Sequence, residues 1–258
     1  MKKWRTLFLK EIKDSMTVFS LLFALVAGFE IYAILNAGQL SGMVLSIFPL
    51  FIVIAVMPLI MFYLYPQEWK SDARYLLMSL PIPRYEIGVC KFLAVMSAGS
   101  VLLLICIVGI YWNSSHFPGW DSFNMNVEIT QDLTVDKELG LSNLFHSNFS
   151  ATGIFLLFST LYFSLGFVIA IQSVNLIVRR FTFFLTILSG ISGSYIYFKF
   201  GAIFSSLLSQ SKIDYFSLSA GNHSLLQQYV FSWSLYTFLM GFVFLGAGLF
   251  LTEKYLEI

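Results

Sequence analysis

The chain has 258 residues, of which 58% are hydrophobic and only 11% charged, and its mean hydropathy is +0.80. Soluble domains contain about 45–50% apolar and about 25% charged residues, so this composition excludes an ordinary soluble domain and indicates an integral membrane protein. The formal net charge of +1 gives no reason to expect nucleic-acid binding.

The first sixteen residues predict an amphipathic helix that lies in the membrane interface. One face of this helix carries apolar side chains at helical spacing: Trp4, Leu7, Phe8, Ile12 and Met16. Basic residues cover the rest, so apolar burial and anionic head groups would hold the helix in the membrane plane. A simple positively charged anchor is the alternative. Because Glu11 and Asp14 interrupt the basic run, the segment is unlike a cleaved signal peptide, and we expect it to be retained.

Six apolar segments are long enough to cross a membrane, which takes about 20 apolar residues in a helix. In chain order they are residues 17–35, 42–64, 92–112, 151–171, 181–198 and 230–251. Their apolar residues do not alternate as barrel strands would, and lipid leaves helices as the other spanning form. The predicted fold class is therefore an all-α membrane protein, with residues 1–258 forming a single transmembrane domain.

Small residues mark the last two spans as places of close helix packing. The fifth span is interrupted by five of them: Ser189, Gly190, Ser192, Gly193 and Ser194. The sixth carries Gly241, Gly246 and Gly248. We expect these spans to pack within the chain or against another subunit, although simple helix flexibility is an alternative explanation.

Basic residues predict the orientation. With both termini inside, twelve of the fifteen Lys and Arg residues fall in inner segments and three in outer segments, namely Lys137, Lys199 and Lys212. Positively charged short loops remain in the cytoplasm, so we expect both termini there, most simply in a bacterial plasma membrane. Residues 65–91 then form a cytoplasmic segment, and residues 113–150 form a large acidic extracellular loop.

The cytoplasmic segment has a distinctive pattern. Glu68 to Ser79 predicts a short helix, and the Pro81 and Pro83 pair ends it because proline lacks an amide donor and disfavours helix in the preceding residue. A new helix is expected to begin at Arg84 and run into the third span. A short helix that projects from the membrane suits docking to a soluble partner, whereas the alternative is an ordinary ordered loop.

Residues 66–91 resemble the ABC-2 type permease family. Members of that family carry a Glu, a Leu-rich helix and then Leu-Pro-x-x-Arg-x-x-Ile…Lys between spans two and three. The matching residues here are Glu68, Leu76, Leu77, Leu80, Pro81, Arg84, Ile87 and Lys91.

The resemblance implies the membrane subunit of an ATP-binding cassette exporter for amphipathic or hydrophobic cargo such as peptides. It also implies a second permease copy, identical or related, and two copies of a separate ATPase subunit. The residues expected to couple the permease to the ATPase are Glu68, Asp72, Arg74, Leu77, Pro81 and Arg84.

The sequence lacks the motifs of several kinds of catalytic and metal site. There is no Gly-x-x-x-x-Gly-Lys-Ser/Thr loop, so we do not expect the chain to bind and hydrolyse ATP itself. As a transport subunit it is expected not to be an enzyme and to bind no cofactor directly, with ATP and Mg²⁺ held by the partner ATPase. The three histidines fall in predicted external loops, and we expect no metal site. The two cysteines, Cys90 and Cys106, are expected to be free thiols.

Glu30 is the ionisable residue that lies well inside a predicted span. Carboxylates at membrane depth are costly, so Glu30 is a candidate for gating or for the substrate pathway. The alternative is that it reaches the outer interface or bonds to a neighbouring helix. A different function class also remains open, in which the chain is a non-transporting sensor or immunity protein that binds a ligand through its acidic extracellular loop. A membrane enzyme acting on lipid would need a polar catalytic cluster, which the sequence does not suggest.

Overall fold

The computed structural model of the protein describes residues 2–36, 40–70, 83–116, 149–178, 182–210 and 224–255. These ranges form six long helices: α1 (Lys2–Leu35), α2 (Leu40–Lys70), α4 (Arg84–His116), α6 (Phe149–Val178), α7 (Thr182–Gln210) and α8 (Ser224–Tyr255). Each helix contains a stretch that is long and apolar enough to cross a membrane. Over the described residues the predicted all-helical fold is therefore confirmed, with six helices long and apolar enough to span a membrane.

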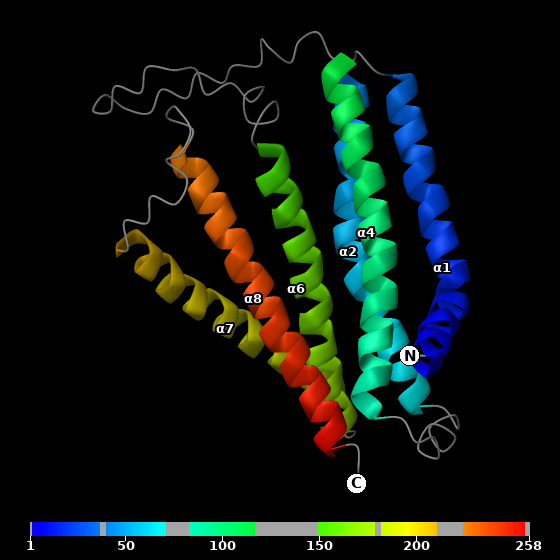
Figure 1. Ribbon diagram of the computed structural model, residues 1–258, viewed down its shortest axis with the longest axis vertical. Helices are drawn as coiled ribbons and strands as arrows, with labels where there is room; N and C mark the ends of the chain where they lie inside the picture. Colours follow the sequence, from blue (N-terminus) through cyan, green and yellow to red (C-terminus); the bar gives the residue numbers. More distant parts are fainter. Residues whose placement is uncertain are drawn as a thin grey trace.

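The helices form two groups that lie side by side (Figure 1). One group contains α1, α2 and α4, which contact one another, and the other contains α6, α7 and α8. Helices α2 and α4 pack against α6 and join the groups, whereas α7 contacts α6 and α8 but none of the other described helices. The beginning of α1 and the end of α8 lie at the same end of the bundle (Figure 1). We call this the terminal end and the other the distal end.

The helices extend beyond the predicted spans. Helix α4 begins at Arg84, directly after Pro83, so the predicted restart of the helix is confirmed. Helix α1 runs without a break from Lys2 to Leu35, and the first residues are therefore helical as expected. Their position in the membrane interface stays a prediction.

Three prolines lie inside α2, and one of them creates a polar contact with a neighbouring helix. Pro66 has no amide hydrogen to offer the carbonyl of Phe62, four residues earlier. The side-chain amide of Gln172 on α6 donates a hydrogen bond to this carbonyl at 3.3 Å. In lipid a backbone carbonyl that lacks its helical hydrogen bond needs another donor. The Gln172 amide supplies this donor and holds α2 to α6.

Helices α6 and α8 approach so closely that their backbones touch. A Cβ atom added at Gly241 would lie 2.8 Å from the Cα atom of Phe163, and one added at Gly248 would lie 3.0 Å from the Cα atom of Ala170. At Gly246, by contrast, no atom lies within 4 Å of an added Cβ. Close packing is thus confirmed for two of the three glycines, and the partner of the sixth span is principally the fourth.

Candidate functional site

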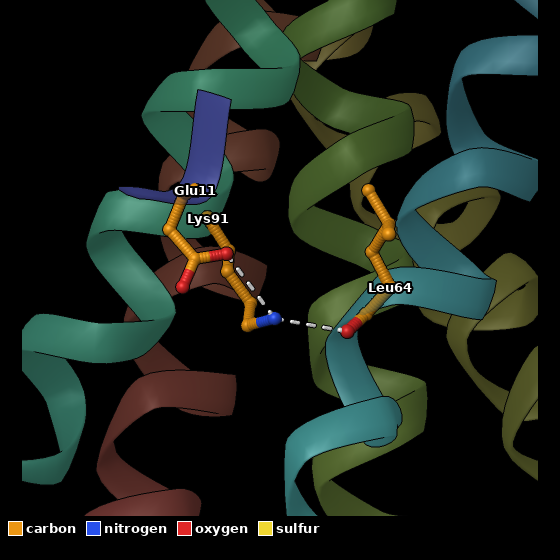
Figure 2. A network of polar contacts seen from close by, with 3 residues as sticks. All are labelled: Glu11, Leu64 and Lys91. Carbon is orange, nitrogen blue, oxygen red and sulfur yellow. Dashed lines mark hydrogen bonds and ion pairs between the residues drawn. The ribbon is translucent and has the colours of Figure 1, made fainter. Parts of the chain in front are cut away.

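A buried ion pair joins three helices at the terminal end of the bundle. The ammonium nitrogen Nζ of Lys91 on α4 lies 3.3 Å from the carboxylate oxygen Oε2 of Glu11 on α1. The same nitrogen donates a hydrogen bond to the backbone carbonyl of Leu64 on α2 at 3.1 Å (Figure 2). The two charged side chains are only 5% and 6% exposed. We refer to Glu11, Leu64 and Lys91 as the Lys91 cluster.

The Lys91 cluster lies beside the predicted coupling segment. Lys91 ends the motif that resembles the permease family, and Leu64 lies near the end of α2, so the cluster connects the helices on both sides of residues 71–82. Breaking a buried ion pair leaves an uncompensated charge inside the protein, which strongly destabilises the fold. The cluster therefore holds α1, α2 and α4 together near the end of α2 and the beginning of α4.

A group of three hydroxyls, which we call the hydroxyl cluster, connects the two helix groups at the same end. The Tyr65 hydroxyl on α2 lies 2.7 Å from the hydroxyl of Thr252 on α8 and 3.3 Å from that of Ser173 on α6. The Ser173 and Thr252 hydroxyls are 2.9 Å apart, and all three residues are buried. Hydrogen bonds of this kind let helices associate in lipid, where polar groups find no water.

The first turn of α4 is also bonded to α8. The backbone amide of Tyr85 donates a hydrogen bond to the carboxylate oxygen Oε2 of Glu253 on α8 at 3.0 Å. A negative charge is favourable beside the unpaired amides at the start of a helix. The beginning of α4 is therefore tied to α8 as well as to α1 and α2.

The predicted coupling residues are only partly described. Glu68 lies in the last turn of α2 and Arg84 is the first residue of α4, but their side chains are not described. The other four, Asp72, Arg74, Leu77 and Pro81, lie outside the described residues. Their roles remain predictions.

Glu30 is enclosed between helices near the distal end. Its side chain is 4% exposed, and neither carboxylate oxygen has a hydrogen-bond partner. The carboxylate lies against Gly109 of α4, where an added Cβ atom would meet it. One turn further along α4, the amide of Asn113 donates a hydrogen bond to the Gly109 carbonyl at 3.1 Å, while its own oxygen Oδ1 has no partner. Glu30 thus lacks the hydrogen bond to a neighbouring helix that the sequence analysis gave as one alternative.

Both cysteines are free, as predicted, and both are buried. Among the described residues no group of three or more His, Cys, Asp or Glu side chains is arranged to hold a metal ion. Of the functional candidates, sequence reasoning missed the Glu11–Lys91 pair and the hydroxyl cluster. A signal existed for the first, since a carboxylate within a basic amphipathic run and a lysine leading into a span both carry charges that the membrane disfavours.

Comparison with known proteins adds no relative, since no family model, curated protein or solved structure matches the chain.

Proposed function

We propose that this protein is the membrane-spanning permease subunit of an ATP-binding cassette exporter, located in the cell membrane with both termini in the cytoplasm. The proposal combines the family resemblance of residues 66–91 with the six-helix membrane architecture. In it, a second permease copy completes the pathway, and two ATPase subunits that bind ATP and Mg²⁺ dock at the cytoplasmic face. The cargo would be amphipathic or hydrophobic, with peptides as the first candidates.

The observation that carries the proposal is the position of the Lys91 cluster. A permease must convert movement of its ATPase into movement of membrane helices. Residues 71–82 are followed by α4 and preceded by α2, and Lys91 bonds to α2 and to α1 within one buried cluster. A force on this segment would therefore displace α1, α2 and α4 together, because separating them would break a buried ion pair.

The hydroxyl cluster suits the second half of such a mechanism. Tyr65, Ser173 and Thr252 are among the contacts that movement of α1, α2 and α4 relative to α6 and α8 would change. Hydroxyls donate and accept, so they can exchange partners during a small rotation at lower cost than a buried ion pair. We therefore assign the rigid connection to the Lys91 cluster and the adjustable connection to the hydroxyl cluster.

The test is co-purification in detergent with the candidate ATPase subunit of the same organism. Wild type should retain the ATPase, and Glu68→Ala and Arg84→Ala should lose it or uncouple its hydrolysis. Lys254→Ala is the matched control, because Lys254 is a basic residue at the terminal end of α8, outside the coupling segment, and it should behave like wild type.

Failure of the wild-type protein to retain any candidate ATPase would overturn the proposal. The sensor or immunity function would then come first, and it predicts a different dependence. Deletion of Gly119–Leu141 should abolish ligand sensing through the acidic loop, whereas a permease should still bind its ATPase through the inner segment.

A further inference from the structure

Glu30 has no positive partner within the membrane-spanning helices that surround it. Residues 15–67 and 92–115 contain no Lys, Arg, Asp or Glu apart from Glu30 itself. The buried lysine of this helix group, Lys91, is already bonded to Glu11 and Leu64 at the terminal end. Any positive charge that balances Glu30 must therefore come from outside these helices.

Three buried acceptor oxygens on Glu30 and Asn113 are unsatisfied. The two carboxylate oxygens of Glu30 and the Oδ1 atom of Asn113 are all buried, and none receives a hydrogen bond. The side-chain amide of Asn113 donates a hydrogen bond to the carbonyl of Gly109. The Glu30 carboxylate also lies against Gly109. The unpaired carboxylate lies at Gly109, which leaves room for it, and the unpaired amide oxygen belongs to Asn113, one turn further along α4.

A buried carboxylate without a partner favours a ligand that is positive. An ionised carboxylate buried without a partner is costly, and proteins resolve the cost by pairing it, by neutralising it or by binding a metal ion. Carboxylate and amide oxygens are hard ligands that suit small, non-transition cations. One carboxylate supplies one negative charge, which a single monovalent cation balances.

We propose that Glu30 and Asn113 form a buried site for one small monovalent cation, either a proton or a sodium ion, between α1 and α4 near the distal end of the bundle. We call it the Glu30 site. Its occupancy would neutralise the carboxylate and strengthen the contact between α1 and α4. Among the described residues, the Cys106 thiol on α4 is a titratable group that interacts electrostatically with Glu30, while residues 40–62 of α2 contain no titratable side chain.

The experiment measures thermal unfolding of the purified chain in detergent by tryptophan fluorescence. In the first arm Na⁺ replaces choline at constant pH and ionic strength, and in the second the pH is lowered without Na⁺. A ligand that binds the folded state alone raises the unfolding midpoint as its concentration rises. By the same linkage, a folded state that holds a proton more tightly than the unfolded state gains stability as the pH falls.

Wild type should respond in one of the two arms, and the arm identifies the cation. Glu30→Gln, which keeps the shape and removes the charge, should lose the response. Asp14→Asn changes an exposed carboxylate on the same helix and should respond like wild type. The proposal is overturned if Glu30→Gln follows wild type in both arms, if wild type responds in neither, or if Asp14→Asn loses the same response.

A second variant keeps the test decisive if Glu30→Gln does not fold. Asn113→Ala retains the carboxylate and removes one acceptor oxygen. It should therefore need a higher Na⁺ or proton concentration to reach half of the stabilising effect. An unchanged half-effect concentration in Asn113→Ala would also contradict the proposed site. Because no ATPase takes part, the outcome is independent of whether the chain is a permease.

Discussion

Removing the ammonium group of Lys91 is expected to destabilise the protein strongly. Lys91→Met keeps an unbranched, flexible stem and removes the charge, which leaves the Glu11 carboxylate buried and without its partner at 3.3 Å. Breaking a buried ion pair in this way costs about 3–5 kcal/mol. Glu11→Gln should cost less, since Lys91 would keep its hydrogen bond to the Leu64 carbonyl.

The double variant measures the interaction energy between Glu11 and Lys91 apart from the contacts that each makes with other residues. In Glu11→Gln with Lys91→Met neither charge remains, so the loss of stability should be well below the sum of the two single losses. Contacting residues of one network typically show coupling energies of about 0.5–3 kcal/mol, and the burial of both groups places this pair near the upper end. Equilibrium unfolding by sodium dodecyl sulfate in mixed micelles would measure all four free energies.

Two surface variants provide the comparison. Lys13→Met and Asp14→Asn change exposed charges on α1 and should alter the unfolding free energy by no more than about 0.5 kcal/mol. The reasoning would be refuted by additive effects of Glu11→Gln and Lys91→Met, or by a Lys91→Met protein as stable as the Lys13→Met control.

Three further results follow from the packing. Tyr65→Phe removes two hydrogen bonds of the hydroxyl cluster and should cost about 1–3 kcal/mol by the same unfolding assay, while an unchanged midpoint would contradict a stabilising role. Gly241→Ala should separate the touching backbones of α6 and α8 and cost about 1–3 kcal/mol, whereas Gly246→Ala, which faces open space, should be tolerated; equal losses would show that close packing is not the cause. The free, buried thiols of Cys90 and Cys106 should react with a maleimide only on unfolding, so rapid labelling of the folded protein would be inconsistent with their burial.

Hydropathy alone determined the membrane class and the number of spanning helices. Both depend on a local property, the summed transfer free energy of about 20 consecutive residues, which needs no knowledge of neighbours. The start of α4 at Arg84 was equally local, because a proline pair restricts the backbone directly before it. Free thiols at Cys90 and Cys106 followed from their separation along one continuous direction of the chain.

Which polar groups meet one another was decided only by the tertiary structure. Glu11 and Lys91 belong to separate helices, and their contact depends on how α1 and α4 are rotated and how they cross. The same dependence distinguishes Gly241 from Gly246, since both are small residues in one span but only one faces α6. It also explains Glu30. Its residue type and its depth in the span were evident from the sequence, but the sequence did not show that its carboxylate is buried against a glycine and has no hydrogen-bond partner. Composition and order along the chain dictate which segments enter the membrane, and the direction of each side chain from its helix dictates what it contacts there.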